Sequence, residues 1–477
     1  MYDPIRPFIT YVARHVKVRL GSSSNPVDGK SECRLIHPVK LTDYKPEDSD
    51  DSTRINIGLI NSKYNEDFEL YGRASYNQLR VILEVKMSKD GVDKAFAQLH
   101  EYTRQLYTEQ HNLHFALGFT VCAGDVRLCH FGPSKAVSSN PMDVATREGR
   151  RAFIELLINM LLCDDSQLGR DPTMHYLSEL RCWQIDCPDD NDDDNSRRGE
   201  VAQYYFTNVI RIADRLFDRH TRCFLATESR PTKKLEEGQS LEATVVIKDA
   251  FAFAKPISSE DDCDEVKTLK RIREMFHDNN PDDILYPKIV VGGRVKFRRG
   301  SQLVEDTTST IYEGVNDELL KLVSSDSLFH AHQHIVMESI GEPLRTVKTA
   351  KEFVAVICDA VQCHYAIVDK CKILHRDISN NNILVVRMKD STVRGLLIDF
   401  DCAIDISRDK KDIDSVSEAR SSNQPRPTPA SDDSTNDIGP FEMRSQEWEE
   451  ISKDLLGVIN KTKVEMSDWK GTPKQSQ

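Results

Sequence analysis

The first part of the chain alternates between strand-like and helix-like hydrophobic patterns. Residues 79–86 form a run rich in aliphatic side chains (LRVILEVK), which predicts a strand. Apolar residues then recur three or four positions apart over 92–106, which predicts an amphipathic helix. An Ala-Gly-Asp turn between apolar segments 115–121 and 127–131 predicts a hairpin. With a second helix predicted over 145–162, this part of the chain is expected to form an α+β domain.

The pattern changes beyond residue 201, where strands come first and helices follow. The clearest strands are predicted over 204–210 and 243–248. Two helices are predicted after them, because apolar side chains recur at helical spacing. The apolar faces are Val266, Leu269, Ile272 and Phe276 in the first helix, and Val354, Ile357, Val361, His364 and Val368 in the second.

Polar and low-complexity segments set the predicted domain boundaries. We expect a mobile leader over 1–55, an acidic linker over 187–200, and a mostly disordered tail with a short helix over 411–477. The segments between them are then an accessory α+β domain at 56–186 and a second domain at 201–410.

Composition narrows the range of partners and compartments. The formal net charge is −13 over 477 residues, so we do not expect tight binding to nucleic acid. No apolar run approaches the roughly 20 residues that span a bilayer, so no membrane partner is expected. Twelve cysteines without any C-x-x-C pair are typical of a reducing compartment. We therefore expect a cytoplasmic or nuclear protein, or one found in both, and not a secreted one.

The candidate chemistry lies in two neighbouring segments, ILHRDISNNNILVV and LLIDFDCAI. Transfer of a phosphoryl group from ATP needs a carboxylate to orient the attacking hydroxyl, and an amide and a second carboxylate to hold metal ions. The candidate base is Asp377, and the candidate metal ligands are Asn382 and Asp399. Their spacing along the chain is that of a protein kinase. An acid-rich turn between two strands of an unrelated domain is the alternative interpretation.

Other parts of a kinase site are predicted upstream. Lys248 ends a predicted strand, as the lysine that contacts the ATP phosphates does, and Glu265 on the next helix is its predicted partner. Glu260 and Asp264 are neighbouring acids that could take the same role. The adenine-binding hinge is predicted at Met337 and Glu338, after an apolar strand and before a glycine.

Three features depart from the usual kinase pattern. No G-x-G-x-x-G precedes Lys248, and the only nearby glycine is Gly238. The third residue of the D-F-G motif is Asp401, which removes a glycine and its conformational freedom. No A-P-E follows.

The motif HRDISNNNIL followed by LIDFD resembles the fungal-type protein kinases, a eukaryotic-like kinase family of fungi. Ser379 and Asp401 are typical of that family, where many serine/threonine kinases carry lysine and glycine. The segment ESIGEPL at 338–344 is also similar to the family, as are 79–107 and 115–131.

This resemblance implies a two-lobed, protein-kinase-like α+β fold preceded by an accessory domain. It implies ATP and Mg²⁺ as cofactors, and a serine or threonine hydroxyl of an unidentified protein as acceptor. In the family, D-F-D is soon followed by G-T-x-P-F-M-A and further helices. Gly471, Thr472 and Pro473 resemble a displaced remnant of that segment, so we expect an incomplete C-lobe and impaired phosphorylation. A pseudokinase or interaction module is the first alternative.

The accessory domain offers a second alternative. Glu84 and Lys86 on a predicted strand, followed by a helix carrying Gln98, resemble the core of PD-(D/E)xK nucleases, which act on nucleic acid with Mg²⁺. Alternation along a strand places Glu84 and Lys86 on one face. Asp67 and Glu69 are the candidates for the further acid, and a solvent-facing ion pair is the plain interpretation.

Overall fold

The computed structural model divides the chain into two units by contacts between its residues. The first comprises Met1–Ser258 and Val291–Val336, and the second Ser259–Val290 and Met337–Gln477. The predicted leader, linker and tail lie almost entirely outside the described residues, and the predicted domain boundaries stay predictions. The described residues are 9–12, 36–40, 57–61, 76–188, 201–212, 219–254, 264–277, 284–299, 302–308 and 329–407.

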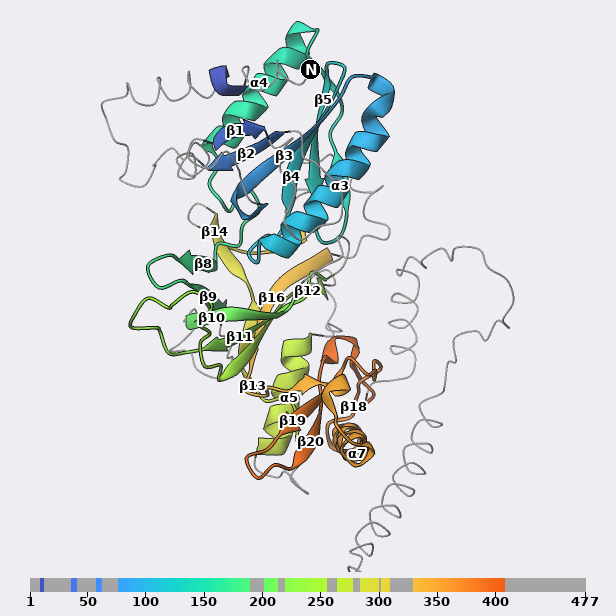
Figure 1. The fold of residues 1–477 in the computed structure, drawn as a ribbon. Helices are drawn as coiled ribbons and strands as arrows, with labels where there is room; N and C mark the ends of the chain where they lie inside the picture. The colour runs from blue at the N-terminus through green and yellow to red at the C-terminus, as the bar shows by residue number, and fades with distance from the viewer. Residues whose placement is uncertain are drawn as a thin grey trace, which may run out of the picture. The chain divides into compact units, whose positions relative to one another are not determined.

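A mixed sheet forms the centre of the first half of the first unit (Figure 1). Its strands follow the order β1-β2-β3-β4-β5-β6, and β7 also pairs with β5. All pairs are antiparallel except β3 and β4, which are parallel and are joined by helix α3 (Val92–Glu109). The strands are β1 (Ile36–Lys40), β2 (Ile57–Asn61), β3 (Leu79–Lys86), β4 (Ala116–Cys122), β5 (Asp125–Phe131), β6 (Ala136–Ser138) and β7 (Met142–Asp143).

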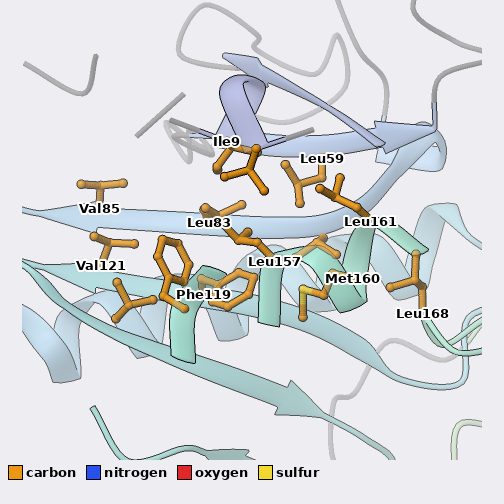
Figure 2. Packing of buried hydrophobic residues seen from close by; sticks show 14 residues of the cluster. Ile9, Leu59, Leu83, Val85, Phe119, Val121, Leu157, Met160, Leu161 and Leu168 are labelled. Carbon is orange, nitrogen blue, oxygen red and sulfur yellow. The ribbon is translucent and has the colours of Figure 1, made fainter. Parts of the chain in front are cut away.

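Alternation along β3 supplies two separate cores, one on each face of this sheet. Leu83 and Val85 face helix α4 (Arg147–Leu162) together with Phe119, as Figure 2 shows. Ile82 belongs to the cluster on the other face, which is covered by α3. Burying one such side chain contributes about 1.5–3 kcal/mol. The predicted strand 79–86 and the predicted helices are therefore confirmed, because their apolar periods match the faces that they bury.

The predicted hairpin is confirmed as well. Ala123 and Gly124 are the two turn residues between β4 and β5, with φ of 48° and 97°. Two consecutive residues with positive φ match the twist of the flanking strands, and glycine adopts this conformation at little cost. Helix α4 begins after Thr146, whose hydroxyl accepts a hydrogen bond from the amide of Gly149.

A second sheet in the first unit carries the predicted phosphate-contacting lysine. Its strand order is β13-β16-β12-β11-β10-β9-β8. The predicted strand over 243–248 begins later and continues further than expected, so Lys248 lies inside β12 and not at its end. The strands are β8 (Met174–Leu177), β9 (Cys182–Pro188), β10 (Val201–Arg211), β11 (Arg222–Thr227), β12 (Val245–Ala254), β13 (Ile289–Arg294) and β16 (Phe329–Met337). A separate hairpin joins β14 (Lys296–Arg299) to β15 (Gln302–Glu305).

The second unit combines two helices with short antiparallel strands. Both predicted helices are present, as α5 (Glu265–His277) and α7 (Ala350–Ala366), and a π-helical turn, Ile367–Cys371, continues α7. The strands are β17 (Glu342–Pro343), β18 (Ile373–Leu374), β19 (Ile383–Arg387), β20 (Val393–Leu397) and β21 (Ile404–Asp405). Within the described parts of the chain, no helix is both long and apolar enough to cross a membrane.

The buried face of α7 agrees only in part with the predicted face. His364 is buried as predicted, but Val354 is 42% exposed, and Val356, Cys363 and Ala366, which were not predicted, are buried. The helix is apolar almost all round, so its period did not specify which side packs inward. Gly395 of β20 marks the packed side, because a Cβ atom there would lie 2.0 Å from the carbonyl oxygen of Val356.

Replacing Gly395 with alanine should therefore destabilise the second unit. The added methyl group meets helix backbone, which cannot rotate away, so we expect a loss of about 3 kcal/mol or more. Gly238→Ala is the control, because a Cβ atom at Gly238 would meet no other atom within 4 Å and only the φ of +78° opposes alanine there. Thermal unfolding followed by circular dichroism compares the two variants. Equal melting temperatures would contradict the close packing of β20 on α7.

Candidate active site

The segment between β18 and β19 carries the predicted base and one predicted metal ligand. Asn382 is buried and donates two hydrogen bonds through Nδ2 to Asp377, one to its carbonyl oxygen (2.9 Å) and one to its carboxylate Oδ2 (3.0 Å). Because Nδ2 is used in this way, the amide oxygen Oδ1 is the atom of Asn382 that can accept a cation. The carboxylate of Asp377 is fixed in orientation by the same contact.

A histidine ring connects this segment to the second predicted metal ligand. The Nε2–H of His375 donates to the carbonyl oxygen of Ile398 (2.9 Å), and its Nδ1 accepts from the amide of Asp377 (3.2 Å). The amide of Ile398 donates to the carbonyl oxygen of Asn382 (2.9 Å). Asp399 follows directly, so the structure holds the backbone that carries Asp399 beside the Asp377 and Asn382 segment.

Left-handed backbone occurs on both sides of this junction. Arg376 has a φ of 66° and Asp399 a φ of 68°. A non-glycine residue in this region costs of order 1–3 kcal/mol and persists where surrounding contacts determine it. Here the His375 hydrogen bonds and the packing of its ring on Phe400, with centroids 4.5 Å apart, supply those contacts.

Three carboxylates meet next to this junction. Glu265 of α5 accepts a hydrogen bond from the amide of Phe400 (3.1 Å). Ligand atoms of Glu265, Asp399 and Asp401 lie within 4.8 Å of one another. Carboxylate oxygens, together with an amide oxygen, are the donors that Mg²⁺ prefers, so the donor set fits such an ion. The sequence marks Asp401 only as a replaced glycine and does not predict its place in this cluster.

The segment after Asp401 is closed by backbone and ionic contacts. Strand β21 pairs with β18, and the amide of Ile406 donates to the carbonyl oxygen of Lys372 (2.8 Å). Arg271 of α5 forms a partly exposed ion pair with Asp405 at 2.5 Å. The helix that carries Glu265 is thereby tied to the chain on the C-terminal side of Asp399.

The remaining predicted site residues are placed in their elements. Lys248 is buried on β12 of the first unit, opposite Cys223 of β11. Met337 ends β16, and the amide of Glu338 donates to the carbonyl oxygen of Lys288 (3.0 Å). The pairing of Lys248 with Glu265 and the adenine contacts of Met337 and Glu338 stay predictions.

The motif geometry agrees with a comparison with known protein families. The model of the fungal protein kinase family matches residues 54–421, more than half of the chain. The chain belongs to the fungal protein kinase family. A search of curated proteins finds no match. A solved structure titled "Structure of vaccinia related kinase 3" is similar at 12% identity, covering 43% of this chain and 49% of that chain, with a TM-score of 0.25. The match thus spans about half the length of that structure.

This member of the family also departs from the usual phosphate-binding loop of kinases. The two strands before β12 are β10 and β11, and the connection between them contains no glycine. Gly238 lies in the next connection, between β11 and β12. The sequence therefore has no glycine-rich loop between β10 and β11, the two strands that precede the lysine-bearing strand β12.

The nuclease alternative rests on one contact in the accessory region. Lys86 Nζ lies 2.6 Å from Glu84 Oε1, so the two side chains share a face of β3, and Glu84 is almost fully buried. Among the described residues, Glu84 is in no cluster of three potential metal ligands. Asp67 and Glu69 lie outside the described residues, and the nuclease-like core stays a prediction.

Removing the His375 ring should destabilise the contact between the Asp377 segment and the segment that leads into Asp399. His375→Ala leaves the Ile398 carbonyl and the Asp377 amide without this partner and opens a cavity beside Phe400. We expect a loss of about 2–5 kcal/mol in the free energy of unfolding, since a cavity and unpaired, partly buried backbone groups both result. Denaturant unfolding measures this loss. Arg376→Ala is the control because that side chain is exposed, and an equally large effect there would contradict the role of the ring.

Proposed function

We propose that this chain is a Mg²⁺-dependent protein kinase that transfers the γ-phosphoryl group of ATP to a serine or threonine hydroxyl. The observation that carries the proposal is the hydrogen-bonded junction of Asp377, Asn382 and the segment leading into Asp399. It joins, within one stretch of chain, the residues that we propose as the base, the amide ligand and the carboxylate ligand. Family membership supports the same reaction class.

In this reaction the acceptor oxygen forms a bond to Pγ while the bond from Pγ to the bridging oxygen of ADP breaks. Asp377 accepts a hydrogen bond from the acceptor hydroxyl and takes its proton as the new bond forms. Asn382 occupies Oδ2 of Asp377, so the other carboxylate oxygen is left to receive the hydroxyl. Holding the hydroxyl in line is a large part of the catalysis, because phosphoryl transfer depends mainly on positioning and charge.

The proposed cation ligands are Asn382 through Oδ1 and Asp399 through its carboxylate. When bound, Mg²⁺ neutralises charge on the β- and γ-phosphates. Glu265 and Asp401 add negative charge beside Asp399, so the site favours a cation before nucleotide arrives.

The ATP contacts proposed for the other predicted residues follow the kinase pattern. Lys248 contacts the phosphates and is oriented by Glu265, and the backbone of Met337 and Glu338 contacts adenine. Loss of catalysis with retained nucleotide binding would instead identify the chain as a pseudokinase, the second candidate. The protein substrate is defined by its hydroxyl acceptor only.

Nucleotide binding should depend on Mg²⁺ and on Asp399. Millimolar ATP with Mg²⁺ should raise the melting temperature of the full chain by about a few degrees, since a ligand that binds only the folded state stabilises it. ATP with a chelator should give little shift, and Asp399→Asn should abolish the Mg²⁺-dependent part. Asp369→Asn is the matched control, because Asp369 is an exposed carboxylate on the π-helical turn. A shift that ignores both Mg²⁺ and Asp399 would contradict the proposed cation site.

Phosphoryl transfer should depend on Asp377. Incubation with radiolabelled ATP and a mixed protein substrate should label serine and threonine, and Asp377→Asn should lower the rate about 100-fold or more. The variant should keep the ATP-dependent thermal shift, because asparagine has the same shape. Equal labelling by both proteins would refute Asp377 as the base. Nucleotide binding without labelling in either protein would favour the pseudokinase.

A further inference from the structure

A second polar cluster lies in the first unit and has no part in the proposed transfer reaction. It contains His114, which precedes β4, Asp306, which follows β15, and His332 on β16. Asp171 and Asp249 surround these three residues. His332 is inaccessible to solvent, and Asp306 is the most exposed of the three, with 16% of its side chain accessible.

Backbone hydrogen bonds fix the positions of the main-chain atoms that carry these side chains. The amide of His332 donates to the carbonyl oxygen of Asp306 (2.8 Å). The amide of His114 donates to the carbonyl oxygen of Gly169 (2.8 Å), and the amide of Asp171 to that of Asn112 (2.7 Å). The cluster is thus built on four chain segments with fixed backbones, as a preorganised ligand set requires.

The contact between Asp306 and the two histidines lacks hydrogen-bond geometry. Asp306 Oδ2 lies 2.9 Å from Nδ1 of His114 and 3.0 Å from Nδ1 of His332. Nevertheless, Oδ2 of Asp306 and Nδ1 of His332 are both buried without a hydrogen-bond partner. Around a tetrahedral zinc ion, with bonds of about 2.0–2.1 Å, ligand atoms lie roughly 3 to 3.5 Å apart. The two separations from Asp306 are close to this spacing, and the ligand atoms of all three residues lie within 4.8 Å of one another.

The other ring nitrogens of the histidines face carboxylates. His332 Nε2 donates to Asp249 Oδ1 at 2.5 Å, and His114 Nε2 lies 3.2 Å from Asp171 Oδ2. The neutral tautomer that donates through Nε2 carries its lone pair on Nδ1, the atom 3.0 Å from Asp306 Oδ2. Asp249 thus holds His332 as carboxylates hold the histidine ligands of metals, whereas His114 Nε2 and Asp171 Oδ2 are buried without a hydrogen-bond partner.

The charges of the cluster call for additional positive charge. Three carboxylates face one guanidinium, that of Arg222, whose Nη1 lies 3.2 Å from Asp249 Oδ2. His334 Nε2 also lies 3.7 Å from Asp171 Oδ2 and from Asp249 Oδ1. The carboxylates outnumber the one guanidinium, so a divalent ion held by His114, His332 and Asp306 would add positive charge among them.

We propose that His114, His332 and Asp306 bind one divalent transition-metal ion, and that this ion is zinc in a structural role. Two imidazole nitrogens and one carboxylate supply three of the four ligands of a tetrahedral zinc ion, and the fourth position is left to a water molecule. Phe251 closes the site, since its ring stacks on His332 at 4.7 Å and meets His114 edge-on at 5.3 Å. A closed site does not admit substrate, so the ion joins the segment before β4 to β16 and does not act as a catalyst.

The metal content of the full chain tests the proposal. Protein produced with zinc in the medium, freed of any affinity tag and desalted, should hold about one zinc ion per chain by elemental analysis. Asp306→Ala should lose that ion and should no longer gain melting temperature when zinc is added. Glu305→Ala is the matched control, because the neighbouring Glu305 only forms an ion pair with Arg294 at 3.1 Å and should keep the zinc.

The alternative is an ion-free network of protonated histidines and aspartates. If the wild-type protein binds no more zinc than Asp306→Ala, even after zinc titration, the network is free of ions and the proposal is overturned. If Asp306→Ala does not fold, X-ray absorption at the zinc edge of the wild-type protein decides. A shell of nitrogen and oxygen with imidazole scattering supports the proposed ligands, and either a sulfur-dominated shell or the absence of bound zinc rules them out.

Discussion

The ring of His375 connects the parts of the catalytic junction. One ring nitrogen binds the backbone before Asp399, and the other binds the amide of Asp377. Neither segment belongs to a long strand or helix, so neither has a regular backbone ladder to fix it. A fully buried ring that uses both nitrogens replaces that ladder, and the left-handed conformations at Arg376 and Asp399 depend on it.

Elements with a clear hydrophobic period could be predicted from the sequence. Strand β3 and helix α3 have the predicted bounds or nearly so, because each buries one regular set of side chains. The order and spacing of Asp377, Asn382 and Asp399 also anticipated a common junction, since the three residues lie within a short stretch of chain. Local signals were sufficient for the elements and for the proximity of these segments, and the roles of the three residues stay predictions.

Features that depend on tertiary packing were not predictable in this way. Lys248 was expected at the end of a strand, but β12 continues beyond it because the strand has partners on both sides in the sheet. The buried side of α7 depends on the close approach of Gly395, which no helical period reports. The histidine cluster draws on segments more than 200 positions apart. Its one local signal is HAHQH at 330–334, where alternate histidines on a strand share a face.

The two proposed cation sites, one at Asp399 and one at His332, differ in the solvent access of their side chains. This difference matches the roles proposed for them. Asp399 and Asp401 are only half-buried, so an ion bound there can keep water and phosphate ligands and leave with product. His332 is fully buried and Phe251 stacks on its ring, while Asp306 has 16% of its side chain accessible, so an ion there exchanges less readily. Hard oxygen donors accompany the open cluster, whereas imidazole accompanies the closed one. Donor type and burial thus agree in each cluster, with an exchangeable cation suited to phosphoryl transfer and a retained cation suited to holding distant segments together.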